Sequence, residues 1–195
     1  MNDTTRHELN GIEIIGFEDA AAWEAWLAEN WQRPEGVWIR VAKKGAGIPS
    51  VTHQEALDVA LCYGWIDGQR KGLDESHFLQ KFTSRRPRSL WSKVNIARVE
   101  KLIAAGRMRE PGFAAIEAAK ADGRWDAAYE SQRNASVPPD LEAALATSER
   151  AREAFEALGK SDRYYAIWQL MTARTPETRE RRLRKLIASL EVGER

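Results

Sequence analysis

The chain has 195 residues, of which 43% are hydrophobic and 30% charged, with a net charge of +1, as expected for a globular protein of one or two domains. It contains no apolar run of about eighteen residues and its polar start has no hydrophobic segment, so the sequence predicts neither a membrane-spanning helix nor a signal peptide. The single cysteine, Cys62, excludes an internal disulfide and is typical of a reducing compartment, so we expect a cytoplasmic protein.

Strands and helices are predicted to alternate in the first part of the chain. A strand over Gly11–Phe17 precedes a helix over Glu18–Trp31, whose tryptophans recur at helical spacing and are therefore expected in the core. Alternating apolar residues predict a second strand over Gly36–Ala42. Thr52 and Glu55 form the capping-box pattern, which indicates that a further helix begins there.

A hairpin and two helices are predicted next. The segments Ile66–Gly72 and His77–Thr83 have the pattern of two antiparallel strands. Helical periodicity returns over Trp91–Ala105. Pro111 is placed to open another helix and Gly123 to close it.

The last part of the chain is predicted to be helical after a linker at Glu130–Asp140. We therefore predict an α+β fold, in which a small, mostly antiparallel sheet covered by helices is followed by a C-terminal module of three or four helices. The predicted domains are residues 1–130 and 131–195. The helices expected in the module are Leu141–Ala146, Glu149–Leu158, Ser161–Ala173 and Pro176–Leu190.

Several kinds of chemistry lack sequence support. The three histidines are scattered, and no His or Cys cluster has the spacing of metal ligands. His53 and Cys62 lie nine positions apart on one predicted helix and face opposite sides of it, which argues against a nucleophile pair. No phosphate-binding loop, dinucleotide fingerprint or serine-hydrolase elbow is present. We expect no metal and no cofactor.

The hairpin and the loop after it carry the residues best suited to a ligand site. Positive charge is concentrated there, with eleven Lys and Arg against five Asp and Glu between Ile66 and Glu110. Arginines in a loop stiffened by Pro87 suit an oxyanion, because each guanidinium donates two hydrogen bonds at once. The candidate ligand-binding residues are Tyr63, Trp65, Asp67, Arg70, Arg85, Arg86, Arg88, Trp91, Ser92 and Asn95.

The roles expected in this site differ by residue type. The arginines would clamp the anion, Trp65 and Trp91 would form flat walls, and Asp67 would orient the guanidinium groups. On the strand, one face is expected to carry Ile66, Gly68, Arg70 and Gly72. Asp67 is also the single weak candidate for a general base.

A structural interpretation of the same residues competes with the ligand site. Asp67 paired with Arg86 or Arg88 would form an ion network that ties the hairpin to the next helix. Alternatively, the charged run is a solvated surface, which is the commoner origin of such a pattern. These residues alone leave the three interpretations open.

The sequence resembles the YdeI/OmpD-associated family of bacterial proteins. The resemblance rests on the motifs "YGWIDG" and "RRPRSLWSK" and on the tail that begins "LEAALATSERAREAF". It covers residues 30–190. Membership would imply a stress-protection role, linked to resistance against bacteriocins or cationic antimicrobial peptides and to association with an outer-membrane porin. It implies no reaction, cofactor or catalytic residue.

Three functions follow as hypotheses. The first is a non-enzymatic, cytoplasmic stress-protection protein that binds a small anion or an acidic protein partner through the arginine and tryptophan residues. The second is an enzyme that acts on a phosphorylated or carboxylated metabolite with Asp67 as acid or base. The third, nucleic-acid binding, is the least favoured because the pI is near neutral. No membrane insertion is expected.

Overall fold

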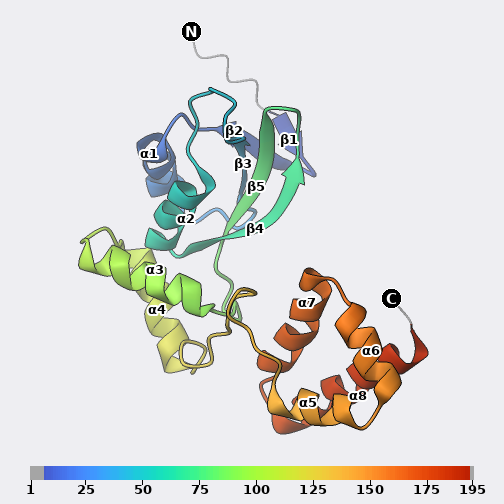
Figure 1. The fold of residues 1–195 in the computed structure, drawn as a ribbon. Helices are drawn as coiled ribbons and strands as arrows, with labels where there is room; N and C mark the ends of the chain where they lie inside the picture. The colour runs from blue at the N-terminus through green and yellow to red at the C-terminus, as the bar shows by residue number, and fades with distance from the viewer. Residues whose placement is uncertain (1–6, 194–195) are drawn as a thin grey trace. The chain divides into compact units, whose positions relative to one another are not determined.

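The computed structural model describes residues 7–193, which form two compact units (Figure 1). The first unit consists of the described residues up to Ser89 together with Asn95–Asp126. The second consists of Leu90–Val94 and the described residues from Ala127 onward. The division after Asp126 lies four residues before the boundary expected from the linker composition, and the short segment Leu90–Val94 joins the second unit.

The first unit is built on a five-stranded sheet in the order β1-β2-β3-β5-β4 (Figure 1). Only the β2–β3 pair is parallel, so the expected mostly antiparallel sheet is confirmed. The first strand was not predicted, because its three residues lie in a polar stretch with no alternating pattern. The strands are β1 (His7–Leu9), β2 (Ile12–Gly16), β3 (Val37–Ala42), β4 (Trp65–Gly72) and β5 (His77–Ser84).

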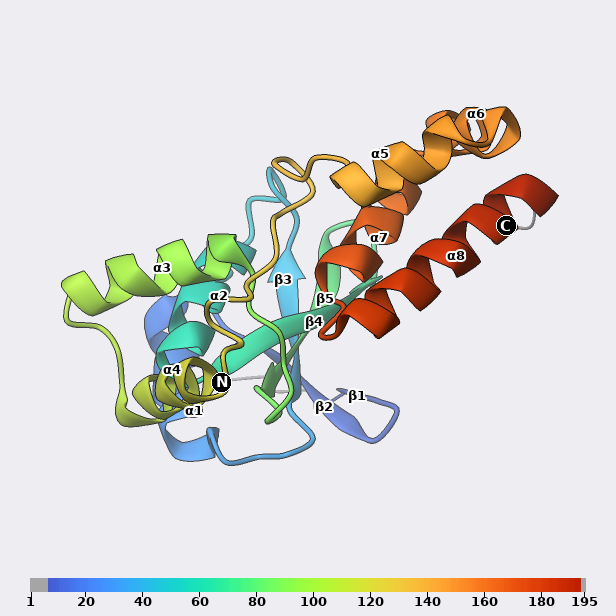
Figure 2. The ribbon, with the colours of Figure 1, turned by 90° about the horizontal axis from the view of Figure 1, so that it is seen from below.

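Two helices, α1 (Ala20–Asn30) and α2 (His53–Cys62), lie side by side against one face of the sheet (Figures 1 and 2). Helix α1 begins one residue after Asp19, whose side chain accepts a hydrogen bond from the Ala22 amide. The capping box predicted at Thr52 is present in full. Both caps satisfy helix amides that would otherwise lack partners.

Aromatic side chains fill the space between these helices and the sheet. Trp23 is fully buried, and its indole nitrogen donates to the Ala56 carbonyl oxygen at 3.0 Å. It stacks on Trp26 with ring centroids 5.4 Å apart and meets Phe82 of β5 at 5.7 Å. The core position expected for Trp23 is therefore confirmed.

Glycines allow helix α4 (Glu110–Ala121) to pack closely against the end of α2. A Cβ atom at Gly112 would lie 2.3 Å from the Cys62 carbonyl oxygen. Gly64, which follows α2, has a φ of +71° that disfavours other residues. Because β4 starts at Trp65, this close approach also positions the start of the hairpin.

Helix α3 (Lys93–Ala104) begins two residues later than predicted. Ser92 forms an isolated parallel bridge with Tyr129, in which the Tyr129 amide donates to the Trp91 carbonyl oxygen at 3.0 Å. The backbone at Trp91 and Ser92 is therefore extended and cannot form the first helical turn.

Four helices form the second unit, as predicted for the C-terminal module. Their buried residues make one core, whose members include Leu141, Phe155, Ile167 and Leu190. No helix among residues 7–193 is long and apolar enough to cross a membrane. The helices are α5 (Pro139–Ala146), α6 (Glu149–Ala157), α7 (Lys160–Met171) and α8 (Pro176–Val192).

One arginine of α8 links that helix to the rest of the module. Arg179 lies at the start of the apolar face of α8. Its Nε and Nη2 atoms donate to the Asp140 carboxylate at 2.7 and 2.8 Å, and Nη1 donates to the Leu170 carbonyl oxygen. The two-pronged pair links α8 to the start of α5.

Candidate anion-binding loop

Hydrogen bonds hold the segment Arg85–Ser89, which we call the arginine loop, in a tight turn. The Arg86 amide donates to the Ser89 hydroxyl oxygen at 3.0 Å, and the Ser89 amide donates to the Arg86 carbonyl oxygen at 2.9 Å. The Arg85 amide donates to the Gly64 carbonyl oxygen at 2.9 Å. Pro87 fixes one backbone dihedral angle within the turn. The loop therefore has a defined backbone before any ligand binds.

Arg124 fixes the far end of the arginine loop. Its side chain is 5% exposed, and its Nη1 atom donates to the Ser89 carbonyl oxygen at 2.9 Å. Its Nε atom donates to the Asp122 carboxylate at 2.7 Å. A buried guanidinium is stable only with such partners. Arg124 is thus a support for the loop that comes from 35 residues further along the chain.

The side chains of Arg86 and Arg88 are exposed on this turn. A fixed backbone that carries two exposed guanidinium groups two positions apart suits a phosphate, sulfate or carboxylate group, because each fork donates paired hydrogen bonds. A preorganised loop also loses less conformational entropy on binding than a flexible one. Arg85, the third arginine of the loop, is half-buried.

A β-bulge changes the faces expected for the hairpin residues. Asp67 is opposite Phe82, whereas Arg70 is opposite Gln80, so the register shifts between Asp67 and Arg70. Phe82 and Gln80 lie two positions apart on β5 and share a face, which places Asp67 and Arg70 on that same face. The expectation that Arg70 alternates with Asp67 and shares a face with Ile66 is therefore wrong.

The buried side chain of Gln80 explains the bulge. Its amide nitrogen donates to the carbonyl oxygens of Gly68 and Gln69 at 3.0 and 3.2 Å, and its Oε1 atom accepts a hydrogen bond from Arg70 Nε at 3.0 Å. The Arg70 guanidinium also lies over the Phe78 ring, 4.4 Å from its centroid. Arg70 therefore has structural partners on its own hairpin.

Asp67 pairs with a histidine rather than with an arginine. Its Oδ2 atom lies 3.0 Å from Nε2 of His53, the first residue of α2, and both side chains are partly exposed. The ion pair with Arg86 or Arg88, which was one of the open interpretations, is replaced by this contact. A carboxylate that orients an imidazole is an arrangement used in general acid–base chemistry, and the spacing of the two residues in the sequence gave no sign of it.

The aromatic residues Tyr63 and Trp65, on either side of Gly64, are buried, whereas Arg86 and Arg88 are exposed. Trp65 is 0% exposed, and its indole nitrogen donates to the Trp31 carbonyl oxygen at 2.7 Å, so it belongs to the aromatic core. Tyr63 is also buried, beside Arg109. The pKa of Arg109 is raised mainly by its hydrogen bonds with the Glu24 carboxylate and, to a smaller extent, by its interaction with the Tyr63 side chain. Neither ring is a flat wall on the surface of the first unit.

The remaining candidates are divided between the two units. Trp91 and Ser92 are buried and belong to the second unit through their backbone pairing with Tyr129. Asn95, half-buried on α3, belongs to the first. Within the first unit, Arg86 and Arg88 are the candidates whose guanidinium groups are exposed on one short loop. No group of three or more possible metal ligands occurs among residues 7–193.

Comparison with family models gives two matches along the chain. Residues 15–115 match the family described as a domain of unknown function (DUF8412), and residues 134–193 match the family described as bacteriocin-protection, YdeI or OmpD-associated. The first match spans more than half of the chain and contains the arginine loop. The second corresponds to the helical module. Curated proteins and solved structures give no significant match.

Proposed function

We propose a binding function for this chain, which belongs to the family of the domain of unknown function (DUF8412) and carries a YdeI/OmpD-associated module. The proposed function is protection of the cell against bacteriocins or cationic antimicrobial peptides, exerted from the cytoplasm. In this proposal the arginine loop binds an anionic group of a small ligand or of an acidic partner. The description of the module's family supports the protective role, and the free, buried Cys62 is compatible with a reducing compartment.

One observation carries the binding proposal. The arginine loop is held by the bond that its Arg85 amide donates to Gly64, by the bonds between Arg86 and Ser89 and by the bond that it accepts from Arg124, while Arg86 and Arg88 remain exposed. A loop that only carried solvated charge would not require a buried guanidinium as its support. Such preorganisation favours a bound anion because the donors are already in place.

A thermal-shift screen of the full chain tests this proposal. The probes are phosphate, sulfate, methyl phosphate, acetate, a nucleotide and a short single-stranded oligonucleotide. A probe present at a hundred times its dissociation constant adds about 2.7 kcal/mol of stability. The wild type should show a raised unfolding temperature with at least one anion, and Arg86→Ala should lose this shift.

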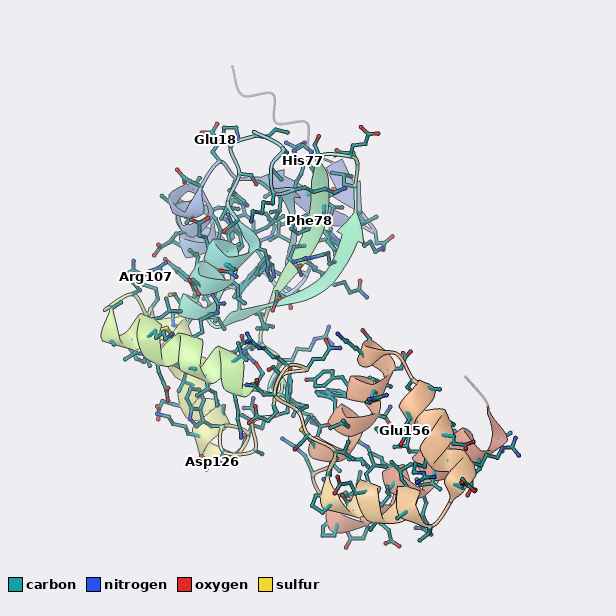
Figure 3. All side chains as sticks on the ribbon, viewed as in Figure 1. Glu18, His77, Phe78, Arg107, Asp126 and Glu156 are labelled. Atoms are coloured by element: carbon teal, nitrogen blue, oxygen red, sulfur yellow. The ribbon has the colours of Figure 1, made fainter. Side chains whose placement is uncertain are left out.

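Arg107→Ala is the matched control for Arg86→Ala. Arg107 is an exposed arginine of the same unit in the turn between α3 and α4, away from the arginine loop in sequence (Figure 3). Its removal changes the net charge equally and should leave the shift intact. Equal loss in both variants would indicate nonspecific charge attraction and contradict the proposal. A shift with the oligonucleotide alone, falling steeply with salt, would favour nucleic-acid binding instead.

The protective role requires a test in cells. A strain that lacks the gene is complemented with wild type, Arg86→Ala or Arg107→Ala and exposed to a cationic antimicrobial peptide. Wild type and Arg107→Ala should restore survival, and Arg86→Ala should not. Equal survival of all three complemented strains would show that protection does not depend on the arginine loop.

A second candidate function rests on the His53–Asp67 contact at 3.0 Å. A partly exposed imidazole oriented by a carboxylate supports acid–base chemistry on a phosphorylated or carboxylated metabolite. The test is incubation with a mixture of such metabolites followed by proton NMR. Consumption by wild type but not by His53→Gln would support an enzyme, and no consumption by wild type would reject this candidate.

A further inference from the structure

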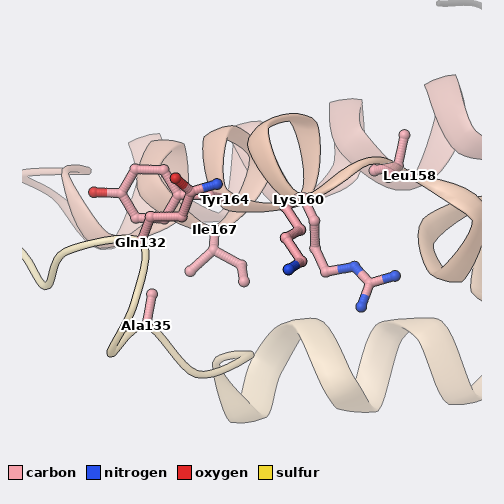
Figure 4. A pocket seen from close by; sticks show the side chains of 7 residues that line it. Gln132, Ala135, Leu158, Lys160, Tyr164 and Ile167 are labelled. Carbon is pink, nitrogen blue, oxygen red and sulfur yellow. The ribbon is translucent and has the colours of Figure 1, made fainter. Parts of the chain in front are cut away.

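A pocket of about 360 Å³ lies in the helical module, away from the residues predicted as a site. Four of its lining residues come from a single face of α7, at positions i, i+3, i+4 and i+7 (Figure 4). The segment before α5 and the residue that follows α6 complete it. Its volume is at the lower end of the range for small-molecule sites. The lining residues are Gln132, Ala135, Leu158, Lys160, Arg163, Tyr164 and Ile167.

Two cations line the pocket without an ion-pair partner among residues 7–193. Lys160 and Arg163 form no ion pair within 4.0 Å among residues 7–193. Elsewhere in the second unit, Arg179 is paired with Asp140 and Lys93 with Glu130. The pocket therefore has an uncompensated positive charge that favours an anionic ligand.

The guanidinium of Arg163 is held in place by two contacts, but one of its donors has no hydrogen-bond partner within the described part of the chain. Its Nη2 atom donates to the Glu156 carbonyl oxygen, and its carbon Cζ lies 5.5 Å from the Phe155 ring centroid. Its Nε atom is buried and has no hydrogen-bond partner within the described part of the chain. A buried donor without an acceptor is costly, and the side chain that carries it lines the pocket, where its guanidinium favours an anion.

Tyr164 and Gln132 add neutral polar groups to the pocket. The Tyr164 hydroxyl donates to the Glu130 carbonyl oxygen at 2.8 Å, which fixes the ring in place. Burial is the main cause of a raised pKa for Tyr164, and the nearby ionisable groups of Tyr129 and Glu130 raise it further. This hydroxyl therefore stays neutral at physiological pH. The side chain of Gln132 is exposed and carries an amide that can donate to a ligand.

Apolar groups form the rest of the lining. Ala135 and Leu158 are half-buried, and Ile167 belongs to the core of the module. In Figure 4 the side chains of Lys160 and Ile167 both point to the side on which Ala135 lies. A ligand that meets the ammonium group therefore also meets hydrocarbon, and burial of an apolar body there is favourable.

We propose that this pocket binds a small organic anion, in which a carboxylate or phosphate group is attached to a short apolar body. Lys160 and Arg163 bind the charged group, and Ala135, Leu158 and Ile167 contact the apolar body. The pocket lies within the YdeI/OmpD-associated match at residues 134–193, except for Gln132. It is a second site, independent of the arginine loop, which belongs to the other unit.

The test is a titration of the ¹⁵N-labelled full chain followed by amide NMR. The probes are benzoate, phenyl phosphate, inorganic phosphate and the neutral benzamide. Benzoate or phenyl phosphate should produce saturable shifts at the amides of residues 132–135 and 158–164. Inorganic phosphate should bind more weakly than phenyl phosphate because it lacks the apolar body, and benzamide should not bind measurably.

Lys160→Gln removes one charge from the pocket at an exposed position and should raise the dissociation constant about tenfold or more. Lys185→Gln removes the same charge from an exposed position of α8 outside the pocket and should leave binding unchanged. Absence of saturable shifts at these amides would overturn the proposal, as would equal binding of benzamide and benzoate. If inorganic phosphate bound as tightly as phenyl phosphate, the proposed contact with an apolar body would be wrong. Binding that is lost in Arg86→Ala but kept in Lys160→Gln would assign the ligand to the arginine loop instead.

Discussion

At the scale of single residues, the arginine loop depends on one side chain outside it. Arg124 is buried, forms an ion pair with the Asp122 carboxylate and donates a hydrogen bond to the Ser89 carbonyl oxygen. Arg86 and Arg88, in contrast, are exposed. This division separates residues that hold the loop from residues that are available to a ligand, and the two kinds of substitution should have different effects.

Replacement of Arg124 by alanine should lower the free energy of unfolding by about 2–3 kcal/mol. The variant leaves the Ser89 carbonyl oxygen without its donor and opens a space in a buried region. It should also weaken anion binding, because the loop loses its support. Urea denaturation followed by tryptophan fluorescence gives the first quantity. An unfolding midpoint equal to that of wild type would show that Arg124 does not support the loop.

The thiol of Cys62 should be unreactive in the native protein. Burial raises its pKa to about 11, so the thiolate fraction at pH 8 is roughly 200-fold below that of an exposed cysteine with a pKa of about 8.5. Its reaction with a disulfide reagent such as DTNB at pH 8 should therefore be slow in buffer and rapid in denaturant. Rapid labelling in buffer would place the thiol at the surface.

At the scale of elements, close backbone approach positions the start of the hairpin. Gly112 of α4 allows that helix to touch the end of α2, and Gly64 allows the chain to turn from α2 into β4. The Gly64 carbonyl oxygen then accepts the hydrogen bond from the Arg85 amide. The packing of α4 on α2 is thus linked to the base of the arginine loop by a short path of backbone contacts.

Substitution of Gly112 by alanine should destabilise the first unit by about 1–3 kcal/mol. The new Cβ atom would lie 2.3 Å from the Cys62 carbonyl oxygen, and the helices must separate to admit it. Gly72→Ala is the control, because a Cβ atom there has no neighbour within 4 Å; its effect should stay within about 0.5 kcal/mol. Thermal denaturation distinguishes the two. Equal stability of both variants would contradict the close approach.

Local sequence patterns predicted the elements well where the structure depends on local signals. The Thr52–Glu55 capping box and the alternation over Val37–Ala42 each correspond to an observed helix start or strand. The two-residue delay of α3 depends on Tyr129, which pairs with Ser92 from 37 positions away. A distant partner of this kind leaves no periodic signal in the sequence.

The candidate site was predicted less completely for the same reason. Clustered charge around Pro87 identified the arginine loop. The bulge at Gly68–Gln69 depends on the side chain of Gln80, and the partner of Asp67 is His53 on another element. Trp65 was expected to form a flat wall of the site, yet it is fully buried and donates to the Trp31 carbonyl oxygen, a partner 34 positions away.

At the scale of the whole molecule, the two units correspond to the two family matches. The match at residues 15–115 lies in the first unit apart from Leu90–Val94, and the match at residues 134–193 lies in the second. Each unit has a core of its own, the aromatic cluster around Trp23 in one and the aliphatic cluster around Leu141 in the other. Stability changes in one unit are therefore best measured with probes of that unit.

The helical module should lose stability in acid through Asp140. The hydrogen bonds from Arg179 lower the pKa of the Asp140 carboxyl. A carboxyl with a lowered folded-state pKa stabilises the fold above its unfolded value of about 3.9, and this contribution disappears as the pH falls through the folded pKa. Because the pair is partly exposed, Asp140→Asn should cost about 1 kcal/mol at pH 7.

Urea denaturation of wild type and Asp140→Asn between pH 2.5 and pH 7 checks this linkage. The difference in unfolding free energy should be largest at neutral pH and close to zero at the acid end. Glu149→Gln is the control, because Glu149 and Arg152 form a longer, more exposed pair at 3.5 Å; this variant should differ from wild type by less than about 0.5 kcal/mol. A constant difference across the pH range would contradict the ion pair.

The most direct measurement of the central claim is NMR of the arginine side chains. In a chain with ¹⁵N-labelled arginine, the Nε–Hε signals of Arg86 and Arg88 can be assigned from the two alanine variants and followed during a titration with methyl phosphate. A preorganised arginine loop that binds an anion predicts that both signals shift together and saturate with one dissociation constant, while the signal of Arg107 stays in place. Small, linear shifts of equal size at Arg86, Arg88 and Arg107 would show that the loop carries only solvated charge.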